Sequence, residues 1–225
     1  MNTKSMLEQL RLTILNQPTS NKTEIIDEAL DAPSGNSPMR KAVIFDKDGV
    51  INHSVQRDDK QTSPWTFQEF LDHLHPKAKT AIQLVKKHGY LALVATNQPG
   101  VMDGDMLMSD LDAICEYLEK EMGIDGIAYA MFRHDKQLYK PGPGMLINFI
   151  HEYQLDTNDT WFIGDRMVDI IAGRRAGVHT VYISEDFSKC DYNLNYKFPE
   201  DCDNKQVIWM KHDILDACKF IVSKD

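Results

Sequence analysis

Three short motifs place acidic and hydroxyl side chains directly after apolar stretches of the sequence, and a fourth places a lysine between such a stretch and the next helix. They are FDKDGV with Asp46 and Asp48, TNQPGV with Thr96, KPGPGM with Lys140, and GDRMVD with Asp165 and Asp169. Neighbouring carboxylates can bind a hard divalent cation, attack phosphorus or transfer protons. A lysine and a threonine can bind the oxygens of an anion. Together these residue types are suited to a single chemical task at one site.

Each motif by itself also has a purely structural interpretation. A D-x-D-G sequence after a strand can be a turn capped by its own carboxylates, and TNQPG can be an ordinary loop. A single lysine is usually a solvated charge, and GDxxxD can cap the start of a helix. The occurrence of all four motifs at strand ends of one chain favours the functional interpretation.

Alternating strands and helices must position these motifs. Apolar strands are expected at residues 42–45, 90–95, 127–132, 160–163 and 178–183, with helices over 76–88, 106–122, 143–153 and up to 176. This alternation predicts a three-layer, Rossmann-like α/β fold, in which helices cover both faces of a parallel sheet. Ligands bind such sheets beyond the carboxyl ends of the strands, which is where the motifs stand.

The motifs resemble those of the haloacid dehalogenase superfamily of phosphatases, over about residues 41–184. FDKDGVIN, TNQPGV, KPGPGM and GDRMVDI are closer to one branch, subfamily III, with its heptose 1,7-bisphosphate and histidinol-phosphate phosphatases. The resemblance implies a Mg²⁺-dependent phosphomonoesterase that forms an aspartyl-phosphate, with a small sugar bisphosphate as the favoured substrate. The alternatives are a histidinol-phosphate phosphatase, a polynucleotide 3′-phosphatase and a catalytically inactive binding protein.

The resemblance assigns a role to each motif residue. Asp46 is the expected nucleophile and Asp48 the general acid and base, while Thr96 and Lys140 bind the transferred phosphoryl group. The expected Mg²⁺ ligands are Asp46, the backbone carbonyl of Asp48 and Asp165, with Asp169 orienting the lysine or a metal-bound water. The expected substrate-binding residues are Asn52, Asn97, Gln98, Arg133, Lys140 and Arg166.

The sequence departs from this branch at two points. The branch commonly has a zinc-binding loop of Cys and His residues before its third motif, but here only His134 is present, so no zinc is expected. Tyr139 replaces the arginine that usually precedes the motif lysine. The only sizeable insertion before the second motif is 52–75, which predicts an essentially capless protein with an open site. Its specificity would come from the loops 52–66, 97–105 and 133–139.

Composition narrows the range of partners. The 225 residues include 34 Asp and Glu against 25 Lys and Arg, a net charge of −9 that argues against nonspecific binding to nucleic acid or an anionic membrane. No membrane span or secretory signal is recognisable, and the four cysteines form no CxxC pair, so a cytoplasmic monomer or small homo-oligomer is expected. The expected domains are an extension and linker (1–40), a phosphatase domain (41–187) and a C-terminal tail packed on it (188–225).

Overall fold

The computed structural model describes residues 39–58, 60–184, 199–200, 202, 207–210 and 213–225. Met39–Asp225 forms a compact unit of its own. Most of the predicted extension and about half of the predicted tail lie outside the described residues. Among the helices that are described, none is both long and apolar enough to cross a membrane.

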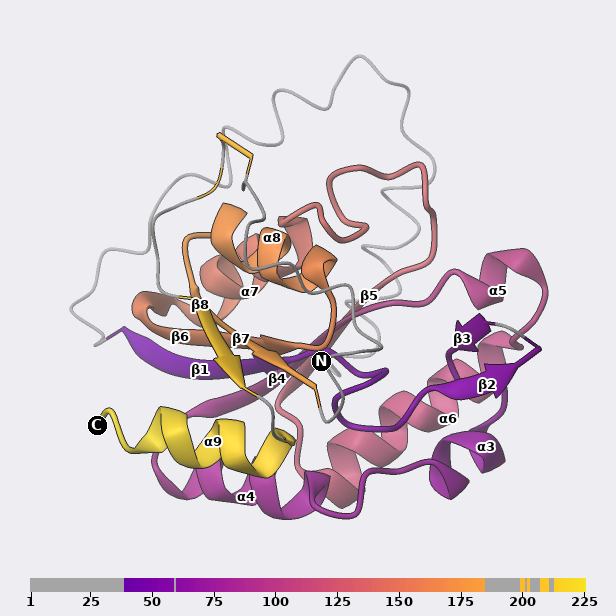
Figure 1. The fold of residues 1–225 in the computed structure, drawn as a ribbon, viewed down its shortest axis with the longest axis horizontal. Coiled ribbons are helices and arrows are strands. Elements are labelled where there is room, and N and C mark those ends of the chain that lie inside the picture. Colours follow the sequence, from indigo (N-terminus) through magenta and orange to yellow (C-terminus); the bar gives the residue numbers. More distant parts are fainter. Residues whose placement is uncertain (1–38, 59, 185–198, 201, 203–206, 211–212) are drawn as a thin grey trace, which may run out of the picture. The chain divides into compact units, whose positions relative to one another are not determined.

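Six parallel strands form the central sheet, in the order β5-β4-β1-β6-β7-β8 (Figure 1). These strands are β1 (Arg40–Phe45), β4 (Leu91–Asn97), β5 (Gly126–Ala130), β6 (Leu155–Gly164), β7 (His179–Ile183) and β8 (Val207–Met210). Strand β1 pairs with β4 on one side and with β6 on the other, so Phe45 lies level with Val94 and Ile163. The strand order therefore reverses at β1, which makes its carboxyl end the expected ligand-binding point of the sheet.

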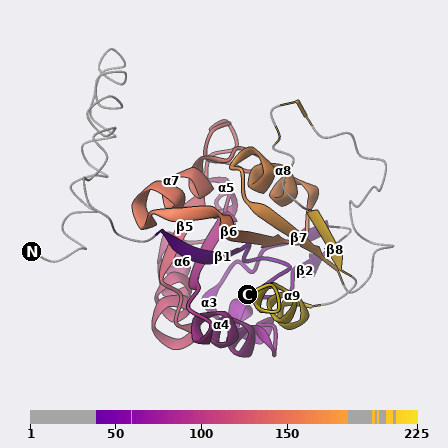
Figure 2. The ribbon, with the colours of Figure 1, turned by 90° about the vertical axis from the view of Figure 1, so that its left-hand side faces the viewer.

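Helices cover both faces of this sheet, as Figures 1 and 2 show. On one face lie α4 (Ala78–Lys87), α6 (Met108–Tyr117) and α9 (Ile214–Val222), and on the other lie α7 (Gly144–Tyr153) and α8 (Met167–Arg175). The alternating side chains of β1 divide between the two cores: Val43 and Phe45 pack on the first face, and Ala42 and Ile44 on the second. The predicted three-layer α/β fold is confirmed.

Several element boundaries differ from those expected. The helix predicted over 106–122 is α6 followed by a π-helical turn, η1 (Leu118–Met122), and the strand expected at 160–163 begins at Leu155. The strand expected to reach residue 132 ends at Ala130, so Arg133 lies in the following loop.

The insertion before the second motif forms a small, partly exposed layer beside the sheet. It contains a two-stranded hairpin, β2 (Val55–Arg57) with β3 (Lys60–Thr62), followed by α3 (Phe67–Asp72) (Figure 1). A short helix, α5 (Gly100–Asp103), follows the second motif. These elements are too small to form a separate cap domain, which agrees with the capless architecture expected from the sequence.

Candidate active site

Asp46 and Lys140 form the buried charged centre of the site. Asp46 directly follows β1, and its backbone N–H donates to the carbonyl of Ile163 on β6 at 2.9 Å. Nζ of Lys140 lies 2.8 Å from Oδ1 of Asp46 and 2.7 Å from Oδ1 of Asp169. Burial disfavours the lysine cation, but the carboxylates of Asp169 and Asp46 outweigh this effect and raise the pKa of Lys140. The lysine, which is only 3% exposed, therefore stays charged next to the predicted nucleophile.

The third and second motifs are tied together by a side-chain amide. Oδ1 of Asn97 accepts a hydrogen bond from the backbone N–H of Lys140 at 3.0 Å, and Nδ2 of Asn97 donates to the Lys140 carbonyl at 3.1 Å. Nζ of Lys140 also donates to the carbonyl of Ala95 on β4 at 3.0 Å. The predicted substrate-binding residue Asn97 lines the cavity, but its amide is engaged in fixing the lysine backbone.

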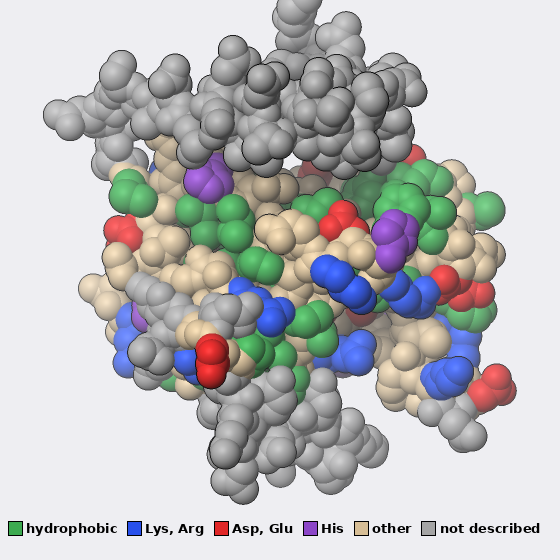
Figure 3. All heavy atoms as spheres, turned by 90° about the horizontal axis from the view of Figure 1, so that it is seen from above, with side chains coloured by type: hydrophobic (Ala, Val, Ile, Leu, Met, Phe, Trp, Pro, Cys, Tyr) green, Lys and Arg blue, Asp and Glu red, His purple; other side chains and the backbone are tan. Residues whose placement is uncertain are grey.

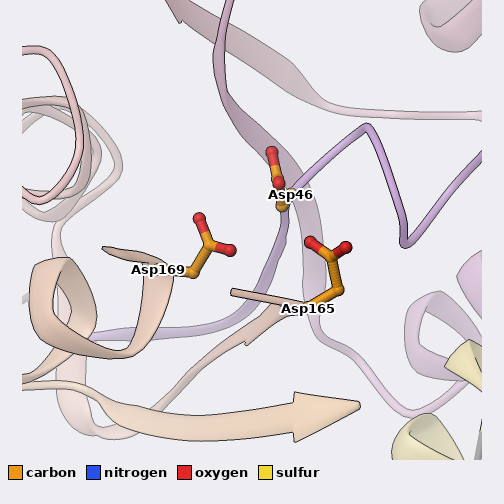
Figure 4. Close-up of side chains that lie close together, drawn as sticks. All are labelled: Asp46, Asp165 and Asp169. Atoms are coloured by element: carbon orange, nitrogen blue, oxygen red, sulfur yellow. The ribbon is translucent and has the colours of Figure 1, made fainter. Parts of the chain in front are cut away.

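Three carboxylates lie close enough to bind one cation. Asp46, Asp165 and Asp169 each offer an oxygen within 4.8 Å of the other two, and they come from the ends of β1 and β6 and from α8 (Figure 4). Oδ1 of Asp165 is buried without a hydrogen-bond partner. Burial, reinforced by the neighbouring carboxylates, raises the pKa of Asp46 to about 6 and that of Asp165 well above its usual range.

This donor set fits the expected cation. Crowded, buried carboxylates without enough positive charge are unfavourable, and hard oxygen ligands suit Mg²⁺. Asp169, expected only to orient other groups, lies within the carboxylate cluster and also pairs with Lys140. The Asp48 side chain is not among the three clustered carboxylates, which is compatible with the expectation that Asp48 binds the metal through its backbone carbonyl.

The carboxylate of Asp48 is held by three side chains. Lys47 and Asn52 donate to its Oδ1 at 2.5 and 3.0 Å, and Gln98 donates to its Oδ2 at 2.7 Å. Burial favours the neutral acid, but the Lys47 ammonium and these hydrogen bonds hold the pKa of Asp48 below its usual value. Asn52 and Gln98, which were expected to contact substrate, each contact Asp48 and are not among the residues that line the cavity. Lys47 was not predicted to have a role, although it stands between the two motif aspartates.

A cavity of about 1080 Å³ opens above these groups. Its lining includes Thr96 and Arg166 from the motifs, and Lys60 and Trp65 from the insertion. Seven aspartates and four lysines or arginines line it among the described residues. On the face seen in Figure 3, basic side chains are mixed with acidic and hydrophobic ones. The cavity is thus poor in positive charge before any cation binds.

Arg133 lies at the rim of this cavity, where it is already paired. Its Nη1 lies 2.5 Å from Oδ1 of Asp103 at the end of α5, and both side chains line the cavity. Trp65 is also fixed, because the guanidinium carbon of Arg57 lies 3.7 Å from the centre of its ring. The sequence indicated that the insertion and the loop after β5 form the walls, but it did not reveal these pairings.

The comparisons with known proteins agree with this geometry. The family model described as polynucleotide kinase 3 phosphatase matches residues 41–201. The D-glycero-alpha-D-manno-heptose-1,7-bisphosphate 7-phosphatase of Campylobacter jejuni is 31% identical over 163 residues, covering 70% of this chain and 90% of the relative. The D-glycero-beta-D-manno-heptose-1,7-bisphosphate 7-phosphatase of Pasteurella multocida is 30% identical over 155 residues, covering 62% and 79% of the two chains.

A solved structure shares the fold. It is the D,D-heptose 1,7-bisphosphate phosphatase from B. bronchiseptica, complexed with magnesium and phosphate, with a TM-score of 0.65 and 21% identity, covering 82% of this chain and 99% of the other. The resemblance stated from the four motifs is confirmed, because the family model spans all of them. The chain therefore belongs to the polynucleotide kinase 3 phosphatase family, within the haloacid dehalogenase superfamily of phosphatases.

Proposed function

We propose that this protein is a Mg²⁺-dependent phosphomonoesterase that acts through an aspartyl-phosphate on a small sugar bisphosphate. One arrangement carries this proposal: Asp46 lies at the carboxyl end of the central strand, beside the buried Lys140 ammonium and within a three-carboxylate cluster. A phosphate dianion is repelled by a carboxylate nucleophile, so the site needs positive charge at this point. Mg²⁺, held by Asp46 and Asp165 with the Asp48 carbonyl, would supply that charge when bound.

The side chains account for both halves of the reaction. A carboxylate oxygen of Asp46 forms a bond to phosphorus, the bond from phosphorus to the leaving oxygen breaks, and that oxygen takes a proton from Asp48. A water oxygen then attacks phosphorus as Asp48 removes its proton. The bond to Asp46 breaks, which releases inorganic phosphate and restores the carboxylate. Thr96 and Lys140 bind the phosphoryl oxygens throughout.

The lowered pKa of Asp48 keeps its carboxylate ionised, which is the protonation state that the second half starts from. Before the first half, the dianionic phosphoryl group enters next to Asp48 and favours its protonated form. One residue can therefore serve both steps, because the charge beside it changes between them.

The relatives and the cavity support a sugar bisphosphate as the substrate. Both curated relatives described above are named as heptose-1,7-bisphosphate 7-phosphatases. A cavity of about 1080 Å³ is large enough for a sugar with two phosphate groups. Arg166 lines the cavity, and a second anionic group could bind Lys60 or Arg133, which is ion-paired with Asp103.

The family model favours a second candidate, the removal of a 3′-phosphate from the end of a polynucleotide. The excess of aspartates in the cavity lining weighs against a longer polyanion, whose binding depends on neutralising several phosphates. The same catalytic side chains would serve either substrate, so only direct comparison separates them.

The experiment measures phosphate release by the purified full chain from heptose 1,7-bisphosphate, histidinol phosphate and a 3′-phosphorylated oligonucleotide. Each substrate is tested with Mg²⁺ and with EDTA, and with the Asp46→Asn variant as the control. We expect the highest kcat/KM for the bisphosphate, full dependence on Mg²⁺, and no turnover by the variant. A preference for the oligonucleotide would select the second candidate, and activity in Asp46→Asn within tenfold of the parent would refute the nucleophile.

A further inference from the structure

We infer that Lys47, Asn52 and Gln98 are positioning residues that fix the carboxylate of Asp48 at the edge of the cavity. This inference rests on the proposed function, because it assumes that Asp48 transfers protons. Predictions from the motifs placed Asn52 and Gln98 on the substrate and gave Lys47 no role. In the structure all three are only 1% exposed, and each donates a hydrogen bond to Asp48.

The donors divide between the two oxygens of the carboxylate. Oδ1 accepts from Nζ of Lys47 and from Nδ2 of Asn52, whereas Oδ2 accepts from Nε2 of Gln98. Bonds on both oxygens prevent the carboxylate plane from turning about its last torsion, which is otherwise a soft motion. The Asp48 side chain remains 16% exposed and lines the cavity, so this orientation leaves an accessible edge for a leaving oxygen.

Gln98 also links Asp48 to the phosphoryl-binding threonine. Its Nε2 lies 2.7 Å from Oδ2 of Asp48 and 3.0 Å from Oγ1 of Thr96. The backbone N–H of Gln98 donates to the carbonyl of Ala130 on the neighbouring strand at 2.7 Å, which holds the residue in place. One amide group therefore fixes the carboxylate of Asp48 relative to the hydroxyl of Thr96, the residue expected to bind the phosphoryl group.

Lys47 also lies near an aromatic ring of the insertion. Its Nζ lies 5.6 Å from the ring centre of Phe70, a fully buried residue of α3 in the insertion. An aromatic face attracts a cation, so Phe70 favours this position of the ammonium group. The insertion thus contributes to proton transfer through Lys47 and Asn52, in addition to forming a wall of the cavity.

Comparing substrates with poor and good leaving groups separates the positioning of Asp48 from a merely structural role of these residues. An alkyl phosphate has a poor leaving group that needs a proton, whereas p-nitrophenyl phosphate has a good one that needs little help. The parameter to compare is kcat/KM, because it reports on the steps up to phosphoryl transfer and excludes later hydrolysis of the aspartyl-phosphate. Misplacing Asp48 should therefore slow the alkyl substrate selectively, while a general loss of folding would slow both equally.

The variants are Gln98→Leu and Lys47→Met, with Lys47→Arg to retain the cation and Asp48→Asn to remove the acid. Gln68→Leu is the matched control, because Gln68 is an exposed residue of α3 that donates to Asp72. We expect Gln98→Leu to lower kcat/KM by roughly 10- to 100-fold for the alkyl phosphate and by less than about threefold for the aryl phosphate. Lys47→Arg should recover most of what Lys47→Met loses, and Gln68→Leu should match the parent.

The outcomes separate a failure of the proposed function from a failure of the positioning role alone. If Asp48→Asn lowers both substrates equally, Asp48 is not the acid, and the proposed function fails together with this inference. If Asp48→Asn is selective but Gln98→Leu lowers both substrates equally or neither, the proposed function stands and the positioning role is overturned. Gln98→Leu alone decides this point if Lys47→Met does not fold.

Discussion

A Cβ atom on Gly49 would lie only 1.9 Å from Oδ2 of Asp165. Gly49 also has a φ of +87°, in the left-handed region that favours glycine. The turn after the two motif aspartates therefore leaves the space in which the carboxylate of Asp165 reaches the cluster. The position of the Asp165 carboxylate in the fourth motif therefore depends on a glycine at position 49 in the first motif.

Gly49→Ala should accordingly displace Asp165 and lower kcat/KM by about a hundredfold or more, since misplacement by about 1 Å can cost that much. Gly104→Ala is the matched control, because Gly104 has a φ of +83° and a Cβ there would meet nothing within 4 Å. Both variants carry the backbone cost of a positive φ, and only the first collides. The measurements are kcat/KM and the stabilisation by Mg²⁺ in thermal unfolding; equal losses in both variants would contradict the collision.

Replacing either of two neighbouring aspartates by asparagine should change the stability of the metal-free protein, but in opposite directions. Asp165 is buried among other carboxylates, and burial raises its pKa, so Asp165→Asn should stabilise the metal-free protein by about 0.5–2 kcal/mol. Asp169 is paired with the buried Lys140, so Asp169→Asn should destabilise it by about 1–3 kcal/mol. Urea unfolding in EDTA measures both. A loss of stability in Asp165→Asn would show that its charge is compensated within the protein.

The stability of the metal-free protein should fall as the pH rises through about 6. The folded state raises the pKa of Asp46 from 3.8 to about 6, so it binds more protons than the unfolded state between these values. Stability falls with pH wherever the folded state binds more protons. Bound Mg²⁺ favours the ionised carboxylates, so the melting-temperature difference between Mg²⁺ and EDTA should widen from pH 5 to pH 7.5. An unchanged difference would contradict this assignment, and Asp46→Asn should weaken the dependence.

The sequence was most informative where a residue's role depends on its position along one strand. Asp46 and Asp165 directly follow apolar strands and Thr96 lies near the end of one, and parallel strands bring their carboxyl ends to one edge of a sheet. The joint placement of these residues was therefore predictable before the strand order was known. The pairing of β1 with both β4 and β6 was not, because it depends on contacts between distant segments.

Hydrogen-bond partners were much less predictable. Asn52 and Gln98 stand in motif loops, and the sequence cannot distinguish an amide that faces substrate from one that faces Asp48. The difference is set by a few ångströms of backbone position. Arg133 and Asp103 present the same problem, since their ion pair joins the loop after β5 to the end of α5, 30 residues away in the sequence.

Substitutions of the two members of this ion pair should change KM for the bisphosphate in opposite directions. Arg133 is the rim cation expected to bind the second anionic group of a bisphosphate, but Asp103 currently neutralises it. Arg133→Ala should raise KM for the bisphosphate by roughly tenfold, the effect of losing one charge-assisted contact. Asp103→Asn should lower this KM instead, because it releases the guanidinium and removes a negative charge from the cavity.

Neither change should alter KM for p-nitrophenyl phosphate by more than about twofold, because that substrate has no second anionic group. The measurement is the ratio of KM values for the two substrates in each variant, at fixed Mg²⁺ and ionic strength. Opposite shifts of this ratio would place Arg133 in the binding of the remote group. If both variants raise KM for the bisphosphate, the ion pair itself shapes the rim, because a guanidinium fixed by Asp103 would then be the form that binds.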